Sequence, residues 1–215
     1  MEEESKEGKE VKCTQQQLSL EEGQLLLASI RPSVDQRIDL ARARGRNAGL
    51  GEPGLMAGAA GYPNIYVGSG AHAANMNILA RLQIGAVLNC APKVCKPPTK
   101  KYKANGIMYK SIDAQDNRTF NVIQNCLEDA SVFIETAHAQ RCNVLVHCMA
   151  GVNRSATLAI AYILCRDRPN IFDQFRKCSN ARPAILQNPS FQLQLCGLAH
   201  DLGLLYEEDD HQNDG

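Results

Sequence analysis

The hydrophobic positions after residue 61 follow two alternating spacings, one typical of β-strands and the other typical of α-helices. Short apolar runs between turn residues predict strands at 64–68, 85–89, 106–112 and 143–147. Apolar residues three and four positions apart predict helices at 73–82, 121–139, 155–165, 171–178 and 191–203. Strands that alternate with helices indicate an α/β fold of three layers, in which helices flank a mostly parallel central sheet.

The first 60 residues carry a different pattern. Residues 1–13 are mostly charged, and residues 14–46 have a helical spacing that Pro32 interrupts. Six glycines and one proline between residues 45 and 61 indicate a linker. The chain therefore divides into an N-terminal extension with a helical segment, a main domain and an acidic tail, at 1–60, 61–203 and 204–215. The helical segment at 14–46 either binds a protein partner, packs on the main domain or forms a coiled coil.

Composition and charge exclude several classes of protein. The 215 residues, 44% of them hydrophobic, suffice for one well-packed domain with extensions. Basic and acidic residues number 23 each, so no global charge favours nucleic acid or a membrane surface. No apolar run reaches the roughly 18 residues of a membrane span, and the acidic N-terminus is unlike a secretory signal. Glu2 excludes N-myristoylation. These features predict a soluble cytoplasmic protein, with the nucleus as the alternative compartment.

Nine cysteines are scattered along the chain without a C-x-x-C pair. This spacing predicts neither a zinc site nor a secreted disulfide framework. In a reducing compartment, most of these cysteines are expected to be buried thiols that pack as small apolar side chains. Cys148 is the exception, because it stands where a predicted strand ends and a loop begins.

Cys148 and Arg154 lie at the two ends of a short loop between the strand at 143–147 and the helix at 155–165. At such a junction, backbone N–H groups and the helix N-terminus attract an anion. The same groups, together with Arg154, favour the thiolate form of Cys148. Five intervening residues let the chain turn back, so that the guanidinium faces the sulfur and binds two phosphoryl oxygens.

A thiolate beside a phosphate cradle predicts attack on phosphorus and a phosphocysteine that water then hydrolyses. Gly151 fits a tight turn, Ser155 donates to the sulfur as it leaves, and His147 orients the loop. Arginine and the loop amides supply the electrostatic stabilisation, so no metal or cofactor is expected. The phosphate-binding residues are expected to be Met149, Ala150, Gly151, Val152, Asn153 and Arg154. The plainer interpretation, a buried cysteine and a helix-capping arginine that meet by chance, does not account for the histidine, glycine and serine around them.

Residues 147–155 resemble the signature loop of the protein tyrosine phosphatase superfamily, and their Arg-Ser ending is similar to that of the dual-specificity branch. Residues 65–69 and 73–75 resemble the opening of that catalytic domain, and residues 87–89 resemble its next strand. Its closing segment is similar to Arg182-Pro183, Ile185, Asn188, Phe191 and Leu195. The resemblance extends from about residue 61 to 202 and favours the small, atypical members. It implies hydrolysis of phosphotyrosine and of phosphoserine or phosphothreonine in proteins.

The family also implies a second catalytic group, an aspartate upstream of the cysteine that protonates the leaving oxygen. Asp116 aligns with this acid better than Asp113, which stays the alternative. A plain turn aspartate that caps the next helix is the other interpretation. Asn188 either braces the phosphate loop, as its family counterpart does, or is a turn asparagine before Pro189.

Three alternatives concern the substrate and the class of function. The chain contains no tryptophan, so the Trp-Pro-Asp loop of the phosphotyrosine-only enzymes is absent. The uncharged loop argues against a phosphoinositide, although phosphoinositides, phosphoglycans and RNA 5′-phosphates stay alternative substrates. A non-catalytic phosphoresidue-binding protein is a further alternative, and the presence of both Cys148 and Arg154 argues against it. We expect neither nucleic acid nor a membrane as a partner.

Cys90 follows a predicted strand that this fold places near the phosphate loop. We hypothesise a protective disulfide between Cys90 and Cys148 under oxidation. The alternative is a buried thiol without a redox role.

Overall fold

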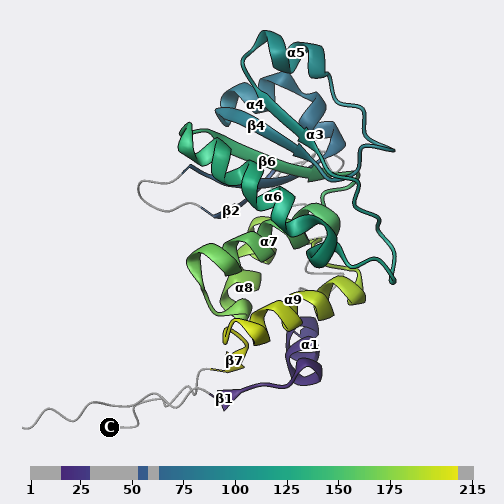
Figure 1. Cartoon of the computed structure of the whole chain (residues 1–215), viewed down its shortest axis with the longest axis vertical. Helices are drawn as coiled ribbons and strands as arrows, with labels where there is room; N and C mark the ends of the chain where they lie inside the picture. The colour runs from purple at the N-terminus through teal and green to yellow at the C-terminus, as the bar shows by residue number, and fades with distance from the viewer. Residues whose placement is uncertain (1–15, 30–52, 58–62, 208–215) are drawn as a thin grey trace, which may run out of the picture.

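A five-stranded sheet forms the centre of the computed structural model, which describes residues 16–29, 53–57 and 63–207 (Figure 1). Its strands, in their order across the sheet, are β2 (Gly54–Ala57), β3 (Ile65–Ser69), β6 (Asn143–Cys148), β4 (Ile84–Asn89) and β5 (Met108–Ser111). The pairings of β3 with β6, β6 with β4 and β4 with β5 are parallel, whereas β2 runs antiparallel to β3. The carboxyl ends of four parallel strands therefore meet at one edge of the sheet.

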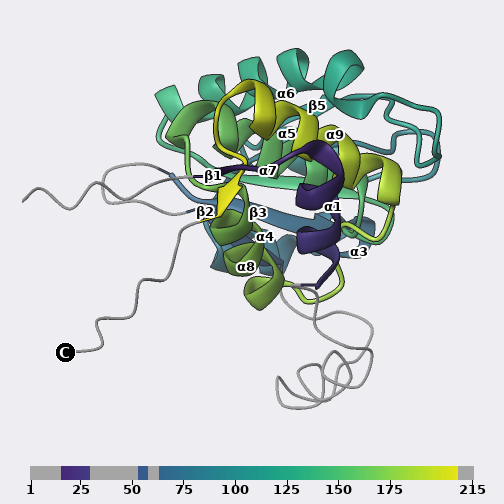
Figure 2. The ribbon, with the colours of Figure 1, turned by 90° about the horizontal axis from the view of Figure 1, so that it is seen from below.

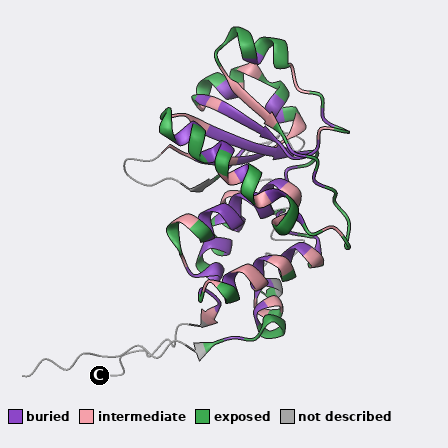
Figure 3. Ribbon diagram, viewed as in Figure 1, coloured by how far each residue is buried: buried purple, intermediate pink, exposed green. Residues whose placement is uncertain are grey.

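The apolar strand residues alternate between two cores, one on each face of the sheet. On β6, Val144 and Val146 belong to the larger core, and Leu145 between them belongs to the smaller one. Both cores are covered, which explains why β6 is apolar at successive positions. Figure 3 shows this as buried strands between helices whose outer surfaces are exposed.

Helices cover both faces, as the α/β prediction requires. The smaller core lies under α3 (Gly70–Ala74), α4 (Met76–Arg81) and α5 (Thr99–Ala104). The larger core lies under α6 (Val122–Ala139), α7 (Arg154–Asp167), α8 (Ile171–Ala181) and α9 (Pro189–Asp201). The side chain of Asn121 accepts a hydrogen bond from the Gln124 N–H and so fixes the start of α6. The predicted three-layer fold is confirmed.

Two predictions about local structure were wrong. The helix predicted at 73–82 is two short helices, because Asn75 leaves the helical conformation and its side chain caps α4 instead. The linker predicted at 45–61 contains strand β2, which fills the open edge of β3. Residues 45–52 and 58–61 of that predicted linker lie outside the described residues. The pattern also missed α5, a short lysine-rich helix with only Tyr102 buried.

Part of the predicted helical segment at 14–46 forms α1 (Leu20–Ser29), which packs against α9 (Figure 2). Leu27 is buried in this contact, and a Cβ on Gly23 would lie 2.7 Å from Leu205 Cδ1. Two-residue strands β1 (Gln16–Gln17) and β7 (Tyr206–Glu207) pair beside it. Of the alternatives predicted for the helical segment at 14–46, packing on the main domain is therefore the one that residues 20–29 adopt. Residues 30–46 and 208–215 lie outside the described part of the chain.

None of the helices in residues 16–29, 53–57 and 63–207 combines the length and the apolar character that crossing a bilayer demands.

Candidate active site

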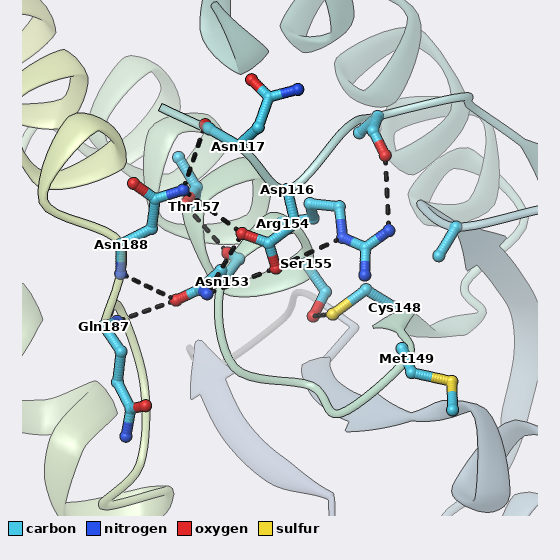
Figure 4. Close-up of polar contacts among 12 residues, drawn as sticks. Asp116, Asn117, Cys148, Met149, Asn153, Arg154, Ser155, Thr157, Gln187 and Asn188 are labelled. Atoms are coloured by element: carbon cyan, nitrogen blue, oxygen red, sulfur yellow. Dashed lines mark hydrogen bonds and ion pairs between the residues drawn. The ribbon is translucent and has the colours of Figure 1, made fainter. Parts of the chain in front are cut away.

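Cys148 is the last residue of β6, and Arg154 is the first residue of α7. The loop between them lies at the edge where the parallel strands end, and Figure 4 shows the side chains of Cys148, Met149, Asn153 and Arg154. Only 1% of Cys148 is exposed. The strand, loop and helix predicted from the sequence are therefore present in the expected order.

The loop carbonyl groups all bond to donors outside the loop. The Met149 carbonyl accepts from the Gly70 N–H at 3.1 Å, and the Val152 carbonyl accepts from the Leu186 N–H at 2.9 Å. Arg182 serves the two carbonyls between them. Its Nη2 donates to the Ala150 oxygen, and its Nε donates to the Gly151 oxygen, both at 2.7 Å. Carbonyls held outward leave the N–H groups to face the centre of the loop, where they bind an anion.

Gly151 makes this turn feasible. Its φ of +70° lies in the left-handed region, and a Cβ at this position would lie 2.4 Å from the Gly68 carbonyl oxygen on β3. A larger residue would therefore strain the turn and push the loop away from the sheet. The glycine predicted for a tight turn occupies such a turn.

The loop lowers the pKa of the Cys148 thiol. Burial alone raises this pKa, but hydrogen bonds from the Ser155 hydroxyl and from the backbone N–H groups of Ser155 and Val152 outweigh the effect of burial. The charge of Arg154 lowers the pKa further. The Ser155 Oγ lies 3.3 Å from the Cys148 Sγ, and Ser155 is itself fully buried. The thiolate is thus available at a lower pH than in an ordinary cysteine.

Asp116 and Asp113, the two candidate acids, have different surroundings. Asp116 Oδ2 lies 3.7 Å from Arg154 Nε, and both its oxygens accept hydrogen bonds from the Asn153 amide at 3.2 Å. Asp113 instead pairs with Lys93 at 2.6 Å, and both of these side chains are exposed. The structure therefore brings Asp116, and not Asp113, to the cysteine loop.

Asn188 connects the closing segment to Asp116. Its amide donates to Asp116 Oδ1 and to the Asn117 carbonyl, each at 3.2 Å, and its Oδ1 accepts from the Ser190 N–H at 3.0 Å. Asn188 therefore caps α9 and also contacts Asp116, whereas its bracing of the phosphate loop stays a prediction.

The other predicted residues lie around the loop. His147 is buried, and burial lowers its pKa to about 4, so the ring is neutral in the physiological range. Its carbonyl accepts from the N–H of Cys90, which is fully buried after β4. Met149 is 58% exposed at the rim, and its sulfur lies 3.9 Å from the Cys95 sulfur.

The residues that support the cysteine loop were not predicted from the sequence. Arg182 was noticed only for its resemblance to the family, and nothing local indicates that it holds two carbonyls 31 and 32 residues away. Asn153 was expected only to bind phosphate through its backbone. Its side chain also accepts from the N–H groups of Gln187 and Asn188 at 2.8 and 3.1 Å. An asparagine just before the helix predicted at 155–165 is the one sequence signal that could have indicated a polar contact here, and in the structure its side chain does not cap the helix.

Residues 65–200 match the family model described as the dual specificity phosphatase, catalytic domain. Human dual specificity protein phosphatase 9 is 33% identical over 153 residues, which are 71% of this chain and 39% of that protein. Human dual specificity protein phosphatase 7 is 30% identical over 149 residues, 69% of this chain and 35% of that protein. The match thus spans well under half of these relatives.

A solved structure supports the same assignment. The crystal structure of DUSP15 aligns with a TM-score of 0.55 at 25% identity and covers 66% of this chain and 91% of that one. The fold and the cysteine loop define a cysteine phosphatase of the protein tyrosine phosphatase superfamily. Within that superfamily, the chain belongs to the dual specificity phosphatase family.

Replacing Ser155 tests the electrostatics of the loop. Ser155→Ala removes a donor to the sulfur, so the pKa of Cys148 should rise. Because only the thiolate is alkylated, the pH midpoint of iodoacetamide labelling at Cys148 should move to higher pH. Mass spectrometry of the Cys148 peptide separates this thiol from the others.

Thr157→Val is the matched control for that substitution. It removes a hydroxyl from the same helix that bonds to the Asn153 carbonyl and not to the sulfur. Equal labelling midpoints for the Ser155→Ala variant and the wild type would contradict the role of the Ser155 hydroxyl.

Proposed function

We propose that the chain hydrolyses phosphate monoesters on tyrosine and on serine or threonine side chains of proteins, with Cys148 as the nucleophile. The main support is the arrangement around the Cys148 sulfur. A hydroxyl donor, the loop N–H groups and Arg154 lower the pKa of the thiol, and the same groups suit a phosphoryl group. Membership of the dual specificity phosphatase family points in the same direction.

In the first step, the Cys148 sulfur attacks phosphorus as the bond to the ester oxygen breaks. Arg154 and the loop N–H groups hold the three remaining phosphoryl oxygens, on which charge accumulates. Asp116 gives its proton to the departing oxygen, so the leaving group departs as a neutral alcohol or phenol. The products of this step are the dephosphorylated side chain and a phosphocysteine.

In the second step, water attacks the phosphocysteine and the sulfur–phosphorus bond breaks. The Asp116 carboxylate formed in the first step accepts a proton from that water. The Ser155 hydroxyl, 3.3 Å from the sulfur, stabilises the thiolate as it leaves. Inorganic phosphate is released, and both catalytic side chains return to their starting protonation states.

Asn153 and Asn188 act in this scheme as positioning residues for the acid. Their amides both donate to Asp116, and Asn153 also binds the backbone of the closing segment. The distance between the proton donor and the phosphate is therefore fixed by three segments that are far apart in the sequence. Such positioning contributes to the rate because small misalignments of a catalytic group are costly.

The loop side chains favour a phosphoprotein over a more highly charged substrate. Between Cys148 and Arg154 stand Met149, Ala150, Gly151, Val152 and Asn153, all uncharged. A headgroup that carries several phosphates gains nothing from these side chains, whereas a single phosphoryl group needs only the backbone and Arg154. Phosphoinositide, phosphoglycan and RNA substrates are the alternatives to be tested in the same assays.

Turnover of para-nitrophenyl phosphate tests the proposed activity. Cys148→Ser should abolish turnover, because a serine hydroxyl is not ionised at this position. Arg154→Lys should lower kcat/KM at least about a hundredfold, since lysine cannot bind two phosphoryl oxygens in one plane. Cys126→Ser, at a buried thiol on α6, is the control and should retain activity. Wild-type turnover no higher than that of the Cys148→Ser variant would refute the proposal.

Dependence on the leaving group tests the assignment of the acid. Asp116→Asn should slow hydrolysis of a phosphotyrosine peptide by roughly 10²–10⁴-fold. It should slow hydrolysis of a difluorinated methylumbelliferyl phosphate much less, because that acidic leaving group needs no proton. Asp113→Asn should leave both substrates nearly unaffected. The opposite pattern would make Asp113 the acid.

We also propose that Cys90 protects Cys148 from oxidation. Peroxide converts the Cys148 thiolate to a sulfenic acid and is itself reduced, and the Cys90 thiol then displaces water to form the disulfide. Burial raises the pKa of Cys90, and the neighbouring Cys148 raises it further. The attacking group is therefore mainly a thiol, and the disulfide should form slowly.

Peptide mapping after mild peroxide treatment tests this step. A linked Cys90–Cys148 peptide and full recovery of activity with dithiothreitol are expected, and Cys90→Ser should be inactivated irreversibly. Cys95 is the competing thiol; burial raises its pKa, and the neighbouring Cys148 raises it further. A Cys95–Cys148 peptide, or no linked peptide, would refute the role of Cys90.

A further inference from the structure

One segment beside the active site carries an unusual concentration of positive charge. Residues 91–112 contain six lysines and no acidic residue, although the whole chain has 23 basic and 23 acidic residues. Five of the lysines lie between residues 93 and 103 and are called the lysine segment below: Lys93, Lys96, Lys100, Lys101 and Lys103. All five are exposed.

Most of this charge is not neutralised within the described part of the chain. Lys93 pairs with Asp113, whereas the other four lysines of the segment have no ion pair with any described residue. Three of those four are on α5, which Figure 3 shows as an exposed helix at one end of the molecule. Like charges held close together repel one another, and the binding of an anionic partner would relieve this repulsion.

The segment is anchored at both ends, to strand β4 at one end and to helix α3 at the other. Asn89, at the end of β4, donates to the Cys95 carbonyl at 3.1 Å and accepts from the Ala91 N–H at 2.9 Å. Tyr102 is buried, and its hydroxyl donates to the Ala73 carbonyl. The lysines therefore project from a backbone of defined position, which reduces the entropy lost when a partner binds.

The lysine segment also begins at the mouth of the active site. Cys95 contacts Met149 of the cysteine loop, and Lys93 pairs with Asp113, three residues before the proposed acid. Figure 1 shows the chain leaving β4 at the edge where the parallel strands end and continuing outward to α5. The lysine segment therefore lies next to Met149 at the rim of the cysteine loop.

We propose that the lysine segment is a docking surface for acidic residues that flank the phosphorylated residue of the protein substrate. This inference rests on the proposed function and specifies its substrate class. The lysines lie outside the cysteine loop, whose own side chains are uncharged, so they fit negative charge at a distance from the reacting phosphate. A ligand with clustered phosphates, such as an inositol lipid, would place its charge nearer to the loop.

A bound substrate lies beside the lysine segment, whereas the ends of the described chain do not. The described chain begins at β1 and ends at β7, and Figure 1 shows both at the opposite end of the molecule from α5. Residues that flank a phosphate held in the cysteine loop have a high effective concentration near the lysine segment.

Matched phosphopeptides test the docking surface. One phosphotyrosine peptide carries three glutamates on its N-terminal side, a second carries them on its C-terminal side, and a third has glutamines instead. Wild type should hydrolyse one acidic peptide with a kcat/KM at least about fivefold above that of the neutral peptide, mainly through KM. This preference should fall as salt is added, because ions screen exposed charges.

Reversing the charge of two lysines tests whether the preference for acidic peptides depends on the lysine segment. Lys100→Glu combined with Lys101→Glu should remove or invert the preference, while turnover of para-nitrophenyl phosphate stays at the wild-type level. Lys177→Glu, at an exposed lysine on α8, is the control and should keep the preference. Turnover of para-nitrophenyl phosphate with equal rates on acidic and neutral peptides would overturn the docking inference and leave the proposed function intact.

Two further results would also overturn the inference. Loss of the preference in the Lys177→Glu variant would show a general charge effect rather than a docking surface. Stronger inhibition of the wild type than of the double variant by phosphatidylserine vesicles or RNA, without any preference among peptides, would assign the lysines to those ligands. Absence of any phosphatase activity would refute the function on which the inference depends.

Discussion

The direction of five carbonyl groups determines whether residues 148–154 can bind a phosphoryl group. If one carbonyl turned inward, it would place a partial negative charge where the anion must bind. Arg182 holds two of the carbonyls outward, the Gly70 and Leu186 N–H groups hold two more, and the backbone N–H of Thr157 on α7 satisfies the carbonyl of Asn153. The low pKa of Cys148 follows from this geometry, because the same inward N–H groups face the sulfur.

Asn153 extends this constraint from the phosphate loop to the acid. One end of its side chain accepts from the backbone N–H groups of the closing segment, and the other donates to both oxygens of Asp116. Three segments from different parts of the chain therefore meet at a single amide. A change in any of them should alter the distance between the proton donor and the phosphate, which makes the proposed chemistry sensitive to residues that never touch the substrate.

Local patterns predicted the parts of the fold that depend on local physics. The apolar run at β6, the helical spacing of α6 with its Asn121 cap, and the cysteine loop all carry their signal within a few residues. The two-helix break at Asn75 and the lysine-rich helix α5 were missed, because one capping side chain and one buried tyrosine override the average pattern. Strand β2 was missed because it forms by pairing with the open edge of β3, about ten residues further along the chain.

The residues of the site likewise fall into those that local spacing could assign and those that depend on the folded chain. Cys148, Ser155 and Gly151 could be assigned from their spacing, since a strand, loop and helix fix their relative positions. The preference for Asp116 over Asp113 came from family resemblance, and its physical reason, the contact with Asn153 and Arg154, requires the folded chain. The roles of Arg182 and Leu186 depend on contacts across more than thirty residues of sequence, for which the chain shows no local signal.

The proposed mechanism requires a covalent bond between the Cys148 sulfur and phosphorus during turnover. Rapid acid quenching of the wild-type protein during hydrolysis of a phosphotyrosine peptide, followed by mass spectrometry, tests it directly. We expect one phosphoryl group on the peptide that contains Cys148, formed and lost at rates consistent with turnover. Steady turnover with no phosphoryl group on that peptide, or with the group on another residue, would contradict it.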